Sequence, residues 1–287
     1  MSETIGKTRI TKLGEAIVRA GGIVSFETAM AMLGENKQAT WRALEWLVKA
    51  GMLRKIRTPG GCHVWMSERT LVRTFNPKEK PAVNKLSRKK ERRRKGRSGT
   101  DRAAVVNELS HTKERWVPGP TFEHDQLALR VLFSLAESSD LLTEHEIRSA
   151  GTWRGRIPDG VLRLTDDFTR REVLAELEVE TSRKTGAISR PSGTQGGWAK
   201  LADRLYRVCH NWFDGPQSTK LGRTDTTLIV APPAHVSAIR KKIAEVERGY
   251  QAREPEHVDR PPGGTIWYYS ELLGDGTFKR PEIDLLI

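Results

Sequence analysis

A run of basic residues in the first half of the chain limits what this sequence can fold into. Residues 85–97 contain nine Lys or Arg and one Glu, which gives a net charge of +8. Pro, Gly and Ser residues lie around this run, and large apolar residues are scarce between residues 76 and 102. Such a segment cannot bury enough apolar surface to form a core. We therefore predict two folded domains, residues 1–75 and 103–287, joined by a basic flexible linker over residues 76–102.

The charge of the whole chain indicates a polyanionic partner. The 287 residues include 49 Lys and Arg against 36 Asp and Glu, a net charge of +13. Double-stranded DNA is the expected partner, with single-stranded DNA as a further one after nicking. No apolar run approaches the roughly 20 residues of a membrane span, and two cysteines are too few for a disulfide framework. We expect a cytoplasmic, nucleoid-associated protein without a membrane partner, and a homodimer is left open.

The first domain has the apolar spacing of three helices followed by a hairpin. The predicted helices cover residues 13–20, a short segment from Ser25 to Gly34, and residues 37–50. The apolar stripe of the third helix is Trp41, Leu44, Leu47 and Val48. Residues 52–66 alternate in type on both sides of Pro59-Gly60-Gly61, which predicts a β-hairpin with a Gly-rich turn. Three helices and a hairpin in this order predict a winged helix-turn-helix.

In a winged helix the third helix enters the major groove and the hairpin reaches the phosphates. The candidate base contacts are Asn36, Lys37, Gln38, Thr40 and Arg42. The candidate phosphate contacts are Arg54, Lys55 and Arg57 of the hairpin and Lys89, Lys90, Arg92, Arg93 and Arg94 of the linker. The linker contacts should release counterions and ignore base sequence. The alternative is a winged helix that serves as a protein adaptor or a dimerisation domain.

The second domain is expected to have an α/β (α+β) fold with a mixed sheet. Residues 124–136 predict a buried amphipathic helix. Two strand-like segments, residues 156–164 and 171–180, are joined by the polar turn Thr165-Asp166-Asp167 and predict an antiparallel pair. A helix over residues 198–213, a buried strand over 226–233, a basic amphipathic helix over 234–250 and a final strand over 265–272 complete the expected order.

Acidic residues alternate along the second strand of this pair. Glu176, Glu178 and Glu180 are expected on one face, with neighbouring carboxylates roughly 6 to 7 Å apart. These carboxylates repel one another unless water or a cation lies between them. On so apolar a strand a divalent cation, Mg²⁺ or Mn²⁺, is the favoured explanation. Asp159 on the partner strand is expected to join them, in an arrangement that suits phosphodiester hydrolysis.

The order Pro158-Asp159, Glu176-Leu177-Glu178 and Lys184 resembles the core of the PD-(D/E)xK nuclease superfamily. The resemblance implies that Asp159 and Glu176 bind metal and that a lysine assists the attacking water. Glu178 stands where the pattern expects that lysine, so its role falls to Lys184 or Lys200 or is lost. Glu178 is then a third ligand or the base that orients water.

A longer resemblance covers residues 13–243. A winged helix, the His124-Asp125 helix, Glu144-x-Glu146, and Lys200 with Tyr206 occur in an order similar to the replication-relaxation family and the C-type plasmid mobilisation relaxases. These join a winged helix to a restriction-endonuclease-like domain. The resemblance adds Glu144 to the metal ligands and makes Tyr206, Tyr268 and Tyr269 candidate covalent nucleophiles, although packing is the simpler role for each.

Two functions follow from these expectations. The first is a metal-dependent DNA endonuclease or nickase of a plasmid or mobile element, a hydrolase whose site is chosen by the winged helix. The alternative is a non-catalytic DNA-binding regulator of replication, mobilisation or transcription with a degenerate nuclease domain. The missing lysine favours the regulator, whereas the retained Asp159, Glu176 and Glu178 favour the enzyme.

Overall fold

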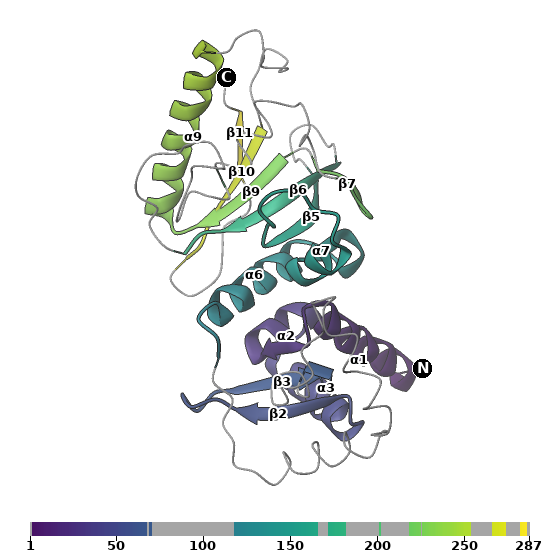
Figure 1. Cartoon of the computed structure of the whole chain (residues 1–287). Coiled ribbons are helices and arrows are strands. Elements are labelled where there is room, and N and C mark those ends of the chain that lie inside the picture. The colour runs from purple at the N-terminus through teal and green to yellow at the C-terminus, as the bar shows by residue number, and fades with distance from the viewer. Residues whose placement is uncertain are drawn as a thin grey trace, which may run out of the picture. The chain divides into compact units, whose positions relative to one another are not determined.

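The structure, a computed structural model, divides into two compact units, Met1–Pro120 and Thr121–Ile287, here called the N-terminal and C-terminal units (Figure 1). It describes residues 2–67, 69–70, 118–165, 172–181, 201, 218–224, 226–253, 266–273 and 282–285. The basic run at residues 85–97 therefore lies outside the described residues, as does almost all of the helix predicted over residues 198–213. None of the described helices is long and apolar enough to cross a membrane.

The N-terminal unit contains three helices and a three-stranded antiparallel sheet. Its elements are α1 (Ser2–Arg19), β1 (Ile23–Ser25), α2 (Phe26–Leu33), α3 (Lys37–Lys49), β2 (Leu53–Arg57) and β3 (His63–Ser67). The strand order is β1-β3-β2. The second and third predicted helices and the hairpin are confirmed. Helix α1 begins at Ser2, before the predicted residue 13, and Ile10 in the added segment packs on the same core as Leu13 and Ile17.

Local side chains mark where α2 begins and ends. The Ser25 hydroxyl accepts a hydrogen bond of 3.2 Å from the Thr28 amide at the start of α2. Gly34, with φ of +66°, ends that helix in the left-handed conformation that suits glycine. The core of the unit is then formed by side chains from α1, α2, α3, β1, β2 and β3, among them the buried Leu44, Leu47 and Trp65.

The C-terminal unit is a mixed α/β fold built on a six-stranded sheet of order β11-β10-β9-β6-β5-β4. The strands are β4 (Leu141–Thr143), β5 (Gly160–Thr165), β6 (Glu172–Val179), β9 (Thr226–Ala231), β10 (Ile266–Glu271) and β11 (Glu282–Leu285), and a small hairpin is formed by β7 (Ser218–Thr219) and β8 (Gly222–Arg223). Strands β6, β9 and β10 are parallel neighbours, and the other pairs of the large sheet are antiparallel. The predicted pairing of β5 with β6 is confirmed, but β10 is not the final strand, because β11 pairs with it at the sheet edge.

Helices cover both faces of this sheet. They are α6 (Phe122–Leu135), α7 (Glu144–Ala150) and α9 (Pro233–Arg253), with a short 3-10 helix, η3 (Ser138–Asp140), before β4. Gly160 of β5 lies against Leu132 of α6, on the face that also carries Leu177. Ile147 of α7 packs with Val161 and Leu174 on the opposite face. Helix α9 lies alongside β9 and β10 (Figure 1) and packs its apolar side on Ile229 and Tyr269.

Candidate functional site

The acidic strand β6 lies inside the sheet, between β5 and β9. Glu176 and Glu178 are exposed to only 2% and 5%, and Glu180, just beyond the strand, to 7%. The side chains on the other face of β6, such as Ala175 and Leu177, are buried as well. The carboxylates are therefore withdrawn from solvent, as expected for so apolar a strand.

Asp159 lies beside Glu178. The strands pair with Gly160 opposite Leu177, so one further step along the register sets Asp159 opposite Glu178. Two hydrogen bonds hold it there: the Asp159 amide donates to the Leu177 carbonyl at 2.9 Å, and its Oδ2 accepts from the Val179 amide at 2.8 Å. The Asp159 side chain is itself buried, with 4% of the residue exposed. The fold thus brings together the two acids that the sequence places on neighbouring strands.

A histidine from another element contacts this pair. Nε2 of His124, in the first turn of α6, lies 3.3 Å from Oδ2 of Asp159. One third of the His124 side chain is exposed, whereas that of Asp159 is almost completely buried. His124 therefore connects the buried acid to the surface. The sequence analysis assigned no role to His124. The one sequence feature that pointed to this residue was the place of His124-Asp125 in the order of motifs.

Glu176 is held by a different neighbour. The fully buried Thr224 donates a hydrogen bond of 3.0 Å from its hydroxyl to Oε1 of Glu176. Thr224 lies between the small β7–β8 hairpin and β9. It is 48 positions from Glu176 in the sequence, so this contact is formed by the tertiary structure. Thr227 of β9 is the register neighbour of Glu176 on the adjacent strand. A hydroxyl that donates to a carboxylate fixes the rotamer of the acid and supports its charge.

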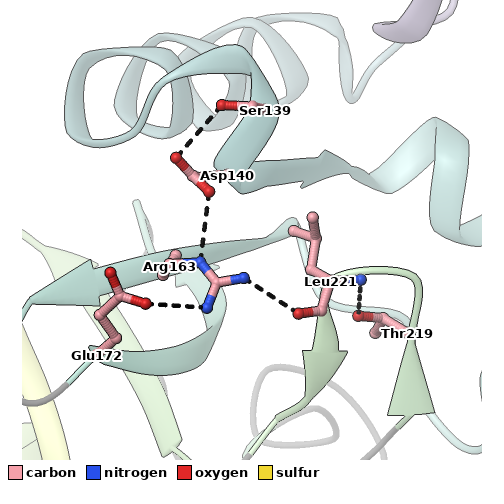
Figure 2. A network of polar contacts seen from close by, with 6 residues as sticks. All are labelled: Ser139, Asp140, Arg163, Glu172, Thr219 and Leu221. Atoms are coloured by element: carbon pink, nitrogen blue, oxygen red, sulfur yellow. Dashed lines mark hydrogen bonds and ion pairs between the residues drawn. The ribbon is translucent and has the colours of Figure 1, made fainter.

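Arg163 anchors the hairpin that precedes Thr224 (Figure 2). Its guanidinium lies between three partners: Oδ1 of Asp140 at 3.3 Å, Oε2 of Glu172 at 3.3 Å and the carbonyl of Leu221 at 3.2 Å. The hairpin is also tied to α7 by an ion pair of 2.9 Å between Lys220 and Glu146. These contacts join η3, β5, β6 and the hairpin, so that the segment carrying Thr224 has a defined place over the sheet.

Other candidates from the sequence lie elsewhere or outside the described residues. Glu144 forms an ion pair with Arg148 one turn along α7. Tyr269 is buried in the apolar cluster under α9, with the Arg240 guanidinium 5.2 Å from its ring centre. A packing role is therefore the one that the surroundings of Tyr269 support. The candidates outside the described residues are Lys184, Lys200 and Tyr206, together with the side chain of Tyr268.

The described acids do not form a complete metal cage. Among the residues that the structure describes, no three side chains of the His, Cys, Asp and Glu types are grouped closely enough to hold a metal ion together. Any cation at this site would have to take part of its coordination from water or from a substrate. Such sharing is the usual habit of Mg²⁺, which retains several waters and needs one or two carboxylates.

Some of the side chains of α3 that were expected to contact DNA are exposed, and others are not available for such a contact. Lys37, Gln38 and Arg42 are exposed. Thr40 is completely buried and donates its hydroxyl to the Asn36 carbonyl at 3.0 Å, so it is not available for a base contact. The Asn36 side chain caps α3 by accepting from the Ala39 amide at 3.0 Å. Both polar residues serve the start of the helix, which the sequence pattern did not reveal.

Trp41 differs from its predicted place in the apolar stripe. Ala43, Leu44 and Leu47 of α3 are buried, but Trp41 is 41% exposed at the edge of the core. Its ring meets that of Trp65 edge-on at 5.8 Å. Trp41 therefore lies partly at the surface of α3, while its ring still contacts Phe26 and Trp65.

The face of the hairpin next to Trp41 is positively charged. Lys55 and Arg57 of β2 lie opposite Trp65 and His63 of β3 in the antiparallel register. Partial burial lowers the pKa of His63, and the charges of Lys55 and Arg57 lower that pKa further. Arg54 is exposed on the same strand. The linker candidates Lys89, Lys90, Arg92, Arg93 and Arg94 lie outside the described residues.

Comparison of the chain with protein-family models, with curated proteins and with solved structures finds no match in any of the three. Function is therefore inferred from the residues of this chain and their geometry.

Proposed function

We propose that this chain is a DNA-binding protein whose N-terminal unit acts as a winged helix-turn-helix and whose C-terminal unit cuts DNA with the help of a divalent cation. The observation that supports the nuclease most directly is that Asp159 is buried beside Glu178. Glu176, two residues earlier on β6, is buried on the same face of the sheet. The resemblance to PD-(D/E)xK nucleases and to C-type relaxases of plasmids and mobile elements agrees with this function.

The N-terminal unit would supply the binding. Helix α3 offers Lys37, Gln38 and Arg42 to the major groove, and the hairpin offers Arg54 and Arg57 to the phosphates. The positions of Lys55 and Arg57 add to this, since Arg57 lies opposite His63 in the register and Lys55 is on the same face of the hairpin. An anionic partner would lower the repulsion among these basic side chains, and DNA presents a regular row of phosphate anions.

The physical cost of the buried acids favours a cation in the C-terminal unit. Several carboxylates held out of water near one another repel, and each is expensive to bury as an anion. The partners of these acids include an amide and His124 at Asp159 and a hydroxyl at Glu176. The amide and the hydroxyl orient the two acids without carrying a full charge. A divalent cation would add the positive charge that lowers the repulsion within the acidic row.

The donor set fits Mg²⁺ or Mn²⁺ in its usual protein role. Asp159 and Glu176 would hold the cation, Glu178 would be the base that orients the attacking water, and waters and a DNA phosphate would fill the remaining positions. The cation would supply charge neutralisation at the phosphate and activation of a water molecule. His124 would keep Asp159 in place, and Thr224 would do the same for Glu176.

Plasmid nicking tests the catalytic half of this proposal. Wild-type protein with supercoiled plasmid and Mg²⁺ or Mn²⁺ should yield nicked or linear DNA, and EDTA should prevent it. Asp159→Asn and Glu176→Gln keep side-chain shape and remove charge, so nicking should fall to background while DNA affinity is kept or raised. Thr224→Val should lower the nicking rate by about 10- to 100-fold, the usual effect of removing a residue that orients a metal ligand, and Thr224→Ser should retain it.

Glu245→Gln serves as the matched control, since Glu245 is an exposed acid of α9 paired with Lys242. This variant should nick like the wild type. If wild-type protein binds duplex DNA and leaves plasmid intact with both metals across many target sequences, the nuclease half of the proposal is wrong.

A second function, a non-catalytic regulator of replication, mobilisation or transcription, would then apply. The observation that favours it is that Asp159 and Glu176 already have protein hydrogen-bond donors and that no three-residue metal group occurs among the described side chains.

A further inference from the structure

Lys55 occupies an unusual position at the junction of α3 and the β2–β3 hairpin. Its ammonium lies 4.1 Å from the ring centre of Trp41 on α3 and 5.9 Å from that of Trp65 on β3. Oε1 of Glu45, also on α3, is 3.7 Å away. The amine is thus held by two aromatic rings and one carboxylate, although 28% of its side chain remains exposed. Both elements that would contact DNA contribute to this arrangement.

The ion pair of Lys55 with Glu45 is the exchangeable part of this arrangement. The 3.7 Å separation is longer than a close charge-assisted hydrogen bond. The Glu45 side chain is 36% exposed, so water screens the pair and weakens it. The aromatic contacts are of a different kind, because Trp41 is fixed by its contacts with Trp65 and with Phe26. A second anion could therefore replace Glu45 while Trp41 continues to hold Lys55.

We propose that Glu45 holds Lys55 in the unbound protein and that a DNA phosphate displaces it, so that Glu45 limits the affinity of the N-terminal unit for duplex DNA. This inference rests on the DNA-binding half of the proposed function. The Trp41 ring acts as a platform that restricts the Lys55 side chain before DNA arrives, which lowers the entropic cost of binding. Glu45 is a positioning residue that must leave the ammonium when the phosphate takes its place.

The location of the pair supports a phosphate rather than a base as the incoming anion. Lys55 shares its hairpin face with Arg57 and His63, a row of basic side chains in register across β2 and β3. The exposed Lys37, Gln38 and Arg42 lie on α3, the element expected in the groove. Glu45 is the acid that interrupts this basic surface on α3, and its removal should help every DNA sequence equally.

Equilibrium binding of the full chain to a short duplex of mixed sequence tests the displacement. Glu45→Gln should bind about two- to fivefold more tightly, the range that corresponds to an exposed charge pair. Lys55→Gln should bind more weakly and lower the slope of log K against log salt by about 0.9, the share of one phosphate contact. In the Lys55→Gln background, Glu45→Gln should produce no further gain, because the two residues act through one contact.

Glu15→Gln is the matched control, since Glu15 is an exposed acid of α1 and its change removes the same charge. It should leave affinity unchanged, and all variants should unfold at the wild-type temperature. A gain that persists without Lys55, or an equal gain in Glu15→Gln, would overturn the displacement and leave simple repulsion as the explanation. Failure of the wild type to bind duplex at low salt would instead overturn the DNA-binding function and this inference with it.

Nuclear magnetic resonance of the unbound protein tests the platform independently of DNA. The ε-methylene protons of Lys55 should be shifted upfield by the ring current of Trp41, and Trp41→Leu should remove most of the shift, since Trp65 is the more distant ring. An ordinary chemical shift in the wild type would show that Lys55 does not lie over the ring and would overturn the preorganised contact.

Discussion

At the start of α3, two polar residues that the sequence offers for base contacts are used by the helix itself. Asn36 accepts the Ala39 amide, and the buried Thr40 donates to the Asn36 carbonyl. Trp41 shows the converse, since an apolar residue assigned to the core is partly at the surface. In the first turn of α3, Asn36 and Thr40 therefore stabilise the start of the helix and are not available as base contacts, and the Trp41 ring is partly exposed on the surface of the helix.

The protonation of His63 should be linked to DNA binding. Partial burial, then Lys55 and then Arg57 lower its pKa below the ordinary value of 6.5 in the unbound protein. The unfolded chain therefore binds more protons than the folded unit near that pH, and stability contributed by this residue is lost as pH falls below about 6.5. A nearby phosphate acts in the opposite direction by favouring the charged imidazole.

Affinity for duplex DNA should consequently rise as the pH is lowered from about 7.5 to about 5.5, where an ordinary histidine gains its proton. Calorimetry in buffers of different ionisation enthalpy should detect proton uptake on binding. His63→Gln should remove this uptake, and His145→Gln, an exposed histidine of α7, should not. Uptake that is unchanged in His63→Gln would assign the linkage to another group.

Among the helices and strands, the contact of α6 with β5 is made at Gly160, the residue that follows Asp159. A Cβ atom on Gly160 would lie 3.0 Å from both terminal carbons of Leu132 and 3.0 Å from the Leu142 carbonyl. The leucine can shift, but the backbone carbonyl belongs to the neighbouring strand β4. The absence of a side chain at this position thus permits α6 and β4 to pack against β5 just beyond Asp159.

Gly160→Ala should therefore destabilise the C-terminal unit by about 1–3 kcal/mol, the usual cost of overpacking a filled core. Urea unfolding followed by the fluorescence of the full chain would measure it. Gly119→Ala is the matched control, because a Cβ there would meet no atom within 4 Å. Equal midpoints for the two variants would contradict the close packing of α6 on β5.

In the chain as a whole, the largest concentration of charge is the basic run at residues 85–97. This run contributes +8 of the total charge of +13. Because Thr40 is buried, the surface of α3 has few polar side chains that could contact DNA bases directly. Non-specific affinity and sequence discrimination should therefore be separable properties of different segments.

Replacing residues 85–97 by a Gly and Ser segment of equal length should test this separation, since the length of the segment is kept. The slope of log K against log salt should decrease by about 0.9 for each phosphate that the basic run neutralises in the wild type. Discrimination between DNA sequences should be unchanged, whereas Gln38→Ala with Arg42→Ala should reduce discrimination and affect the slope less. Equal salt slopes for the wild type and the replaced segment would contradict the polyelectrolyte role.

Much of the architecture could be predicted because it depends on local periodicity. Alternating residue types predicted β5 and β6, a polar turn predicted their antiparallel pairing, and helical spacing predicted α3, α6 and α9. The row of acids on β6 and the approach of Asp159 also followed, since both depend on residues within one hairpin. Each of these features is encoded within a short stretch of chain.

The tertiary structure alone decided which distant residues meet this hairpin. Thr224 reaches Glu176 across 48 positions, and His124 reaches Asp159 from α6. Trp41 holds Lys55 because α3 and β2 pack together. Periodicity tells which face of an element is buried, but it carries no information about the partner on that face. That choice depends on how all the elements pack at once, and it is made by the shape and chemistry of the complete core.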